Sequence, residues 1–187
     1  MMTASRKRLS NRIAVLLLAG IVLLGGFVGI SMGSRSDLVA IGRIAPDFTA
    51  GASDGTTVRL SAQQGHRRVV LVFYPADYSP ICTAQLCSLR DTWKALQTEN
   101  TVVYGINSAG TAKHAGFAAQ NRLPFPLIAD RDGEIARRYG CRALFGIVKR
   151  TVYVIDRRGV VVWVERGNPS PGTILQALHG LNDARLP

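Results

Sequence analysis

Cysteine, acidic residues and metal-binding motifs are scarce in this sequence of 187 residues. The three cysteines are Cys82, Cys87 and Cys141, too few for a disulfide framework of the kind that holds small secreted domains together. The histidines are equally few and isolated: His66, His114 and His179. Each is expected to be a surface or capping residue, and no zinc-type spacing occurs. The composition therefore excludes a disulfide scaffold and gives no support to a metal site.

The shortage of acidic residues makes the chain basic, with a formal net charge of +11. Residues 1–36 hold five cations and no acidic residue, so the remainder carries 18 cations against 12 acids. Its arginines are scattered or paired, and they do not cluster with aromatic residues as in nucleic-acid-binding surfaces. No nucleic-acid partner is expected, and a solvated basic surface near anionic lipid explains the charge more simply.

Long apolar runs are absent except for one, Ile13–Ile30, which four cations precede. Eighteen helical residues span about 27 Å at ~1.5 Å each, close to the thickness of a bilayer core. The apolar part of a secretory signal is usually shorter, about 7–15 residues. Residues 1–36 are therefore predicted to be an uncleaved transmembrane signal anchor. A cleaved signal peptide, with Ser31 and Gly33 near the cut, is the alternative.

The basic residues before the apolar run predict its orientation, because cations stay on the cytoplasmic side. The N-terminus is then cytoplasmic, and residues 37–187 form a domain on the periplasmic or other extracytoplasmic side. Cleavage would instead release this domain to the periplasm. An odd number of cysteines in an exported protein suggests at least one free or redox-active thiol.

Expected helices and strands alternate along residues 37–187, which predicts an α/β fold with a central mixed β-sheet flanked by helices. Two continuous apolar runs predict strands covered on both faces. A hairpin follows the alternating part, since turn residues separate the last two strands. The expected strands cover residues 57–60, 69–74, 102–106, 125–128, 151–155 and 160–164. The expected helices cover residues 79–98, 111–121, 132–139 and 171–181.

The most informative segment runs from Pro75 to Cys87, after the strand at 69–74 and into the helix at 79–98. Two cysteines thus stand near the start of a helix. The first N–H groups of a helix are unpaired and carry partial positive charge, which favours the thiolate form of a cysteine. If the chain is an enzyme, its chemistry is expected here.

This segment closely resembles the active-site segment of peroxiredoxins, and most of all the bacterioferritin comigratory protein (PrxQ) branch. The family pattern Pro-x-x-x-Thr/Ser-x-x-Cys is met by Pro75, Ser79 and Cys82, and the second cysteine of the branch by Cys87. The resemblance spans residues 42–181 and implies a thioredoxin-like fold. Three further positions depart from the pattern: Ile81 replaces a usual Gly, Gln85 a common Glu, and Cys141 is additional.

The resemblance also implies roles. Cys82 would attack the peroxide and become a sulfenic acid, and Cys87 would resolve it to an intramolecular disulfide. Arg150 would act as a clamp on thiolate and peroxide, Ser79 would offer a hydroxyl, which a helix N-cap would also use, and Pro75 would shield the pocket.

The five-residue spacing of Cys82 and Cys87 sets a geometric condition. On an intact helix the two side chains point some 140° apart and lie roughly 7.5 Å apart along the axis. A disulfide needs Cα atoms within about 4.4–6.8 Å. The helix is therefore predicted to unwind by one or two turns on oxidation.

The function that the resemblance implies is a thioredoxin-dependent peroxiredoxin acting on hydrogen peroxide and organic hydroperoxides. A thioredoxin-like donor would re-reduce it, no haem, flavin or metal would take part, and the internal resolving thiol would permit a monomer. An exported thiol–disulfide oxidoreductase is the alternative, although it calls for Cys-x-x-Cys. A copper-handling protein would call for Cys-x-x-x-Cys and a distal His. Neither spacing is present.

Overall fold

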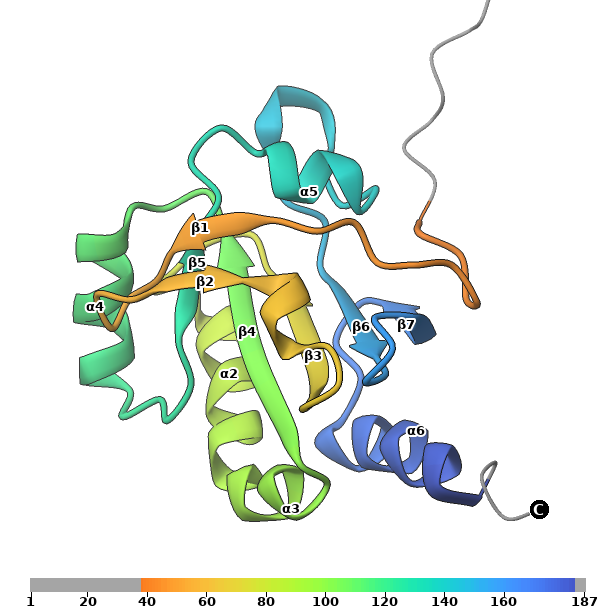
Figure 1. The fold of residues 1–187 in the computed structure, drawn as a ribbon. Coiled ribbons are helices and arrows are strands. Elements are labelled where there is room, and N and C mark those ends of the chain that lie inside the picture. Colours follow the sequence, from red (N-terminus) through yellow and green to blue (C-terminus); the bar gives the residue numbers. More distant parts are fainter. Residues whose placement is uncertain (1–37, 184–187) are drawn as a thin grey trace, which may run out of the picture. The chain divides into compact units, whose positions relative to one another are not determined.

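Five strands form a mixed central sheet in the order β5-β4-β3-β6-β7, as Figure 1 shows. The computed structural model describes residues 38–183. Strands β3, β4 and β5 run parallel, whereas β6 is antiparallel to β3, and β7 to β6. The strands are β3 Arg68–Phe73, β4 Thr101–Asn107, β5 Leu127–Ala129, β6 Thr151–Ile155 and β7 Val161–Arg166. The mixed sheet flanked by helices predicted from the sequence is confirmed.

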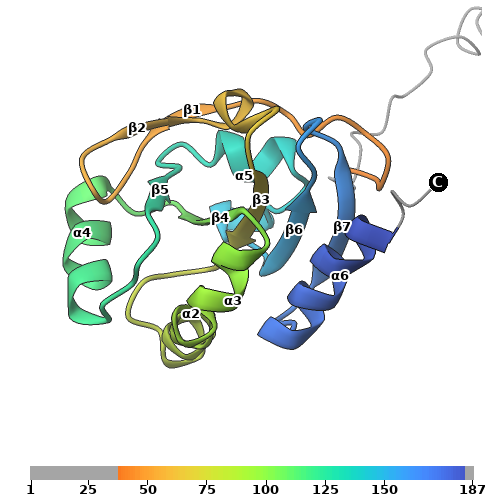
Figure 2. The same cartoon turned by 60° about the horizontal axis from the view of Figure 1, so that its bottom comes forward.

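Each face of this sheet has its own apolar core, which explains why β3 is apolar without alternation. Val70 and Val72 point to the layer formed by the helices α2 (Pro80–Asp91), α3 (Trp93–Thr98) and α6 (Pro171–Asp183). Leu71 and Phe73 point to the opposite layer, which holds α5 (Glu134–Arg138) and the small hairpin of β1 (Thr49–Gly51) and β2 (Thr57–Arg59). Figure 2 shows these two layers on either side of the sheet, with α4 (Thr111–Gln120) beside β5.

Some elements differ from the prediction. The helical character expected over residues 79–98 is confirmed, but the stretch is divided into two helices, because α2 ends at Asp91 and α3 begins at Trp93. At the break, Thr92 leaves the helical region with a φ of −99° and a ψ of 7°, although its N–H and its hydroxyl both bond the Ser88 carbonyl. Two short elements were not predicted: strand β1, which pairs with the predicted β2, and the 3-10 turn η2 (Leu144–Gly146). A further 3-10 turn, η1 (Leu60–Gln63), follows β2, where a helix or turn was expected to start at Ser61.

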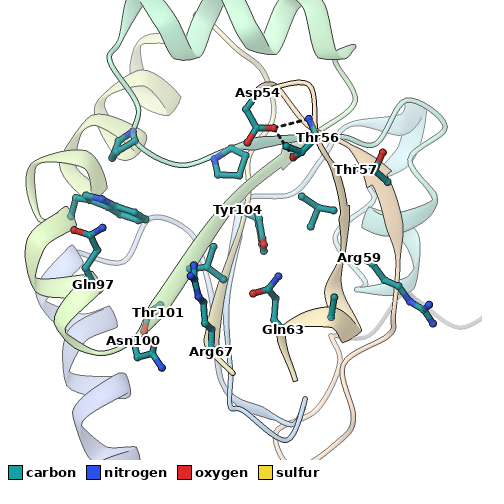
Figure 3. A pocket seen from close by; sticks show the side chains of 16 residues that line it. Asp54, Thr56, Thr57, Arg59, Gln63, Arg67, Gln97, Asn100, Thr101 and Tyr104 are labelled. Atoms are coloured by element: carbon teal, nitrogen blue, oxygen red, sulfur yellow. Dashed lines mark hydrogen bonds between the residues drawn. The ribbon is translucent and has the colours of Figure 1, made fainter. Parts of the chain in front are cut away.

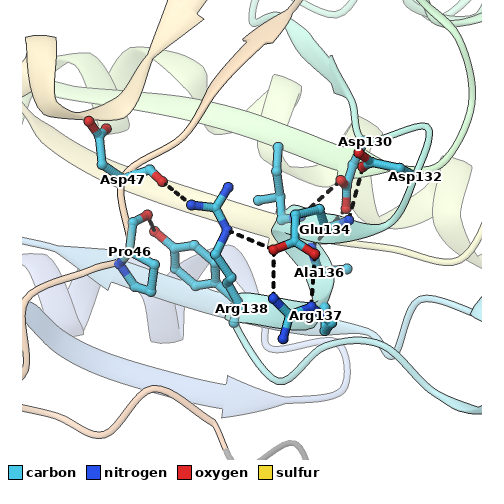
Figure 4. A network of polar contacts seen from close by, with 10 residues as sticks. Pro46, Asp47, Asp130, Asp132, Glu134, Ala136, Arg137 and Arg138 are labelled. Atoms are coloured by element: carbon cyan, nitrogen blue, oxygen red, sulfur yellow. Dashed lines mark hydrogen bonds and ion pairs between the residues drawn. The ribbon is translucent and has the colours of Figure 1, made fainter.

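A polar network holds the short helix α5 in place (Figure 4). The buried Asp130 carboxylate accepts the N–H groups of Ile135 and Ala136 at 2.9 and 2.8 Å. At the other end of the helix, Arg138 donates to the Asp47 carbonyl at 2.6 Å, which ties α5 to the chain before β1. The helix is thereby fixed on both sides, and the segment that leads from it to β6 starts from a fixed point.

The predicted N-terminal anchor lies in residues 1–36 and thus outside the described residues. Within residues 38–183, no helix combines the length and apolar character needed to cross a bilayer. The domain boundary at residues 36/37 stays a prediction.

Candidate active site

The first turn of α2 carries Cys82. The chain leaves β3 at Phe73, passes through an irregular loop and enters the helix at Pro80, with Ser79 as the N-cap residue. A proline suits this first helical position, because its fixed φ matches the helix and its missing N–H would be unpaired there anyway. Cys82 is then the third helical residue, so its backbone lies in the partially positive first turn, while its side chain is fully buried.

Arg150 reaches Cys82 from another part of the chain. It directly precedes β6, and the antiparallel register pairs Thr151 with Phe73 at the end of β3. Its Nη2 lies 3.2 Å from Cys82 Sγ, and its Nη1 donates to Gln85 Oε1 one turn further along α2. The planar guanidinium thus holds a fixed orientation beside the sulfur. A positive charge at this distance stabilises a thiolate.

The other two predicted site residues line the approach to the helix. Ser79 is partly exposed, and its carbonyl accepts the Thr83 N–H at 2.8 Å. Its hydroxyl makes no capping hydrogen bond within the described residues, so it is free to meet a ligand. Pro75 is exposed at the start of the loop. The structure therefore brings Ser79, Cys82 and Arg150 to one end of α2, with Pro75 in the adjoining loop.

Cys87 lies on the same unbroken helix and is partly buried. Its Sγ is 3.8 Å from Asn121 Oδ1, at the C-terminal end of α4. Cys82 and Cys87 are both free thiols in this structure. Since α2 is continuous from Pro80 to Asp91, the geometric condition drawn from the five-residue spacing applies to it.

A buried polar cluster underlies the loop before α2. Asp77 Oδ1 accepts the Tyr74 hydroxyl at 2.7 Å and the Asn107 amide at 2.8 Å. Asp77 Oδ2 lies 2.9 Å from His114 Nδ1, off the line of an ideal hydrogen bond. Burial by itself raises the pKa of Asp77, but the contacts with His114, Tyr74 and Asn107 outweigh it and lower that pKa. Burial, with Asp77 beside it, raises the pKa of Tyr74.

The sequence did not predict this cluster. The expectation that His114 is a surface or capping residue is wrong, because its side chain is fully buried. The signal available was weak: His114 and Phe117 stand three residues apart on one predicted helix, which places both on the same face. Nothing local pairs His114 with Asp77.

Cys141 stands apart from the site. It is fully buried in the core layer that holds Tyr139 and Tyr153, whereas Cys82 belongs to the layer on the opposite face of the sheet. Burial raises the pKa of the Cys141 thiol to about 11.

A separate pocket lies elsewhere on the domain. A cavity of about 600 Å³ lies between the β1–β2 hairpin and the start of β4, lined by Arg67, Trp93, Thr101 and Tyr104 among others (Figure 3). Because β3 and β4 are parallel, the start of β4 and the start of α2 lie at opposite ends of the sheet. No cysteine lines this cavity. It is therefore not the thiol site.

Comparisons with known proteins agree on one family. The model of the AhpC/TSA family matches residues 41–164. A chloroplastic peroxiredoxin Q of Triticum aestivum is 38% identical over 135 residues, which cover 71% of this chain and 62% of the relative. A bcp-type peroxiredoxin of Coxiella burnetii is 34% identical over 134 residues, which cover 67% of this chain and 88% of the relative. The chain thus spans less than two thirds of the wheat protein but most of the bacterial one.

Solved structures show the same likeness. The crystal structure of peroxidoxin BcpB from Mycobacterium tuberculosis superimposes with a TM-score of 0.70 and 34% identity, covering 78% of this chain and 98% of that one. A peroxiredoxin Q of Xanthomonas campestris gives a TM-score of 0.68 at 22% identity, covering 79% and 98%. The thioredoxin-like α/β fold expected from the sequence is confirmed.

Proposed function

The chain belongs to the AhpC/TSA family, in its peroxiredoxin Q/bcp branch, and on this premise we propose that it is a thiol-dependent peroxidase with Cys82 as the nucleophile. The observation that carries the proposal is the 3.2 Å contact between Arg150 Nη2 and Cys82 Sγ in the first turn of α2. A fixed cation and a helix N-terminus together favour the nucleophilic thiolate.

In the first step the Cys82 thiolate attacks one oxygen of a hydroperoxide. A sulfur–oxygen bond forms, the oxygen–oxygen bond breaks, and Cys82 becomes a sulfenic acid. The departing oxygen takes up a proton and leaves as water or an alcohol. Arg150 stabilises the negative charge as it moves from the sulfur to that oxygen. The Ser79 hydroxyl donates a hydrogen bond to the thiolate or to the peroxide. Pro75 shapes and shields the loop at the approach.

In the second step Cys87 resolves the sulfenic acid. Its thiolate attacks Cys82 Sγ, a disulfide forms, and the oxygen leaves as water. Both residues lie on the continuous helix α2, so this step demands that the helix unwinds around them. Both sulfurs come from one chain, so a monomer suffices.

A dithiol donor completes the cycle by thiol–disulfide exchange, which returns both cysteines to thiols and oxidises the donor. A thioredoxin-like protein is the proposed donor, and hydrogen peroxide and small organic hydroperoxides are the proposed substrates. No resident cofactor enters this sequence of steps.

The proposed place of action is the extracytoplasmic side of a membrane, held there by residues 13–30. This part of the proposal is supported by the sequence pattern alone. Sequencing the N-terminus of the mature protein tests it, since an intact start supports the anchor and a start after residue 33 supports cleavage.

Peroxide consumption with dithiothreitol as reductant tests the chemistry. Cys82→Ser should abolish turnover, while Cys141→Ser, a change to the thiol on the other face of the sheet, should leave it intact. Mass spectrometry of peroxide-treated protein should find a link between Cys82 and Cys87. Undiminished turnover in Cys82→Ser would defeat the proposal, and a stable link between Cys82 and Cys141 would defeat the role of Cys87. If the wild type reduced insulin disulfides but consumed no peroxide, it would be a thiol–disulfide oxidoreductase instead.

A further inference from the structure

The segment that carries both thiols rests on one helix, α4. Three side chains of this helix or of its C-cap make the contacts: His114, Phe117 and Asn121. Their spacing of three and four residues places them on one face of the helix. The loop before α2 meets the first two, and the later part of α2 meets the third.

The first contact joins the loop to α4 through buried charge. The Asp77 and His114 side chains are both fully buried, and 2.9 Å separates Asp77 Oδ2 from His114 Nδ1. His114 Nε2 has no hydrogen-bond partner within the described residues, so Asp77 is the polar contact that orients the ring. Tyr74 and Asn107 occupy the other carboxylate oxygen. Opening the loop would separate Asp77 from all three groups.

The second contact holds a strained residue. Tyr78 has a positive φ of 62°, an unusual conformation for a bulky side chain. Its ring packs edge-on against Phe117, with ring centroids 5.0 Å apart. Such a conformation persists only where the surroundings impose it. Release from Phe117 lets Tyr78 relax, so the strain favours opening while the packing opposes it.

The third contact fixes the turn of α2 that carries Cys87. The Asn121 carbonyl accepts Arg90 Nη1 at 2.7 Å, and Asn121 Oδ1 lies 3.8 Å from Cys87 Sγ. The Asn121 amide in turn donates to the Phe117 carbonyl at 2.9 Å. Cys87 on α2 is therefore held against the end of α4. The same helix, α4, also holds the loop before Cys82.

We propose that α4 is a latch for the thiol-bearing segment, and that Asp77 and His114 are positioning residues that control how readily α2 opens after Cys82 is oxidised. The inference rests on the proposed function. A sulfenic acid has two fates, condensation with Cys87 or attack by a second peroxide to give a sulfinic acid. Condensation needs the open segment, so a weaker latch shifts the product from sulfinic acid to disulfide.

The test measures both fates in single turnover. Wild type, Asp77→Asn and His114→Ala are treated with one equivalent and then with excess hydrogen peroxide, and the disulfide and sulfinic acid are quantified by mass spectrometry. We expect disulfide formation to accelerate about threefold or more in both variants, as local opening becomes easier, with a smaller sulfinic fraction. His114→Gln, which keeps a donor for Asp77, should restore much of the wild-type partition.

Asp54→Asn is the matched control, because this carboxylate is exposed and, among residues 38–183, bonds locally to Thr56. Asn121→Ala tests the latch from the other end if Asp77→Asn does not fold. An unchanged ratio of disulfide to sulfinic acid in the latch variants would overturn the inference. The inference would also be overturned if the latch variants unfolded at a lower temperature and formed disulfide and sulfinic acid equally more slowly, because this result indicates a merely structural role. A wild type that formed neither product would instead refute the proposed function.

Discussion

At the scale of single residues, the site depends on a contact between two distant positions. Cys82 and Arg150 are separated by 68 residues, and the pairing of β3 with β6 brings them together. Arg150 also bonds Gln85, a neutral amide that holds the guanidinium without neutralising its charge. The full positive charge therefore remains available to the sulfur.

Replacing Arg150 tests this arrangement. Arg150→Met should slow the reaction of Cys82 with hydrogen peroxide by about 100-fold or more, the usual scale for losing one donor to a developing oxyanion. The rate for Arg150→Lys should lie between those of the wild type and Arg150→Met. An ammonium keeps the positive charge, but it cannot bond Cys82 and Gln85 together as the planar guanidinium does. Stopped-flow measurement of the oxidation step gives the rates.

The neighbouring Lys149 provides the control, since it is also cationic but its side chain is exposed. Lys149→Met should change the rate less than twofold, as is usual for surface substitutions away from the chemistry. An equal loss in both variants would mean that the general basic field matters, and not the guanidinium on the sulfur.

At the scale of elements, α5 depends on a cap outside its own bounds. The helix has only five residues, too few to be stable from its own hydrogen bonds. Asp130 supplies two acceptors to its first turn, and Gly133 provides the left-handed residue that starts it, with a φ of 70°. Burial raises the pKa of Asp130, although the two N–H groups oppose this shift.

Asp130→Ala should therefore lower the free energy of unfolding by about 1–2 kcal/mol, the range seen when capping acceptors are lost. Asp132→Ala is the comparison, because the exposed Asp132 lies beside Asp130 and accepts the Glu134 N–H, at 3.0 Å, in place of the two N–H groups that Asp130 accepts. Its cost should be smaller, at roughly 0.5 kcal/mol. Urea unfolding measures both, and equal midpoints for the two variants would contradict the assignment of the main cap to Asp130.

At the scale of the whole molecule, buried acids that keep their protons link stability to pH. Burial raises the pKa of Cys141 to about 11, and it also raises the pKa values of Tyr74, Tyr139 and Tyr153. The unfolded chain releases these protons at lower pH than the folded chain does. Above about pH 9 the folded state therefore binds more protons, and stability falls as the pH rises.

The urea midpoint should accordingly be lower at pH 10.5 than at pH 8. Replacing Cys141 with Ala should flatten part of this decline. The shift from 9.0 to about 11 at this fully buried thiol is worth roughly 3 kcal/mol once the pH exceeds both values, and roughly 2 kcal/mol of this is already lost at pH 10.5. An equally steep decline in Cys141→Ala would show that the tyrosines alone carry the effect.

The fold was largely predictable because its signals are local. Continuous apolar runs predicted the strands of the central sheet, and the turn at Asp156–Gly159 predicted the hairpin of β6 and β7. Where the prediction failed, tertiary or side-chain contacts decided the outcome. Strand β1, for example, forms because β2 pairs with it.

The segment from Pro75 to Cys87, its place between strand and helix, and the family that it resembles could all be recognised from the order of the residues. These are properties of neighbouring residues, which local sterics and helix polarity control. The contact of Arg150 with Cys82 and that of Asp77 with the buried His114 became visible in the folded chain alone. Both contacts depend on strand register and helix packing, which arise when distant segments bury apolar surface together. The local sequence around either residue of a pair therefore does not predict the contact.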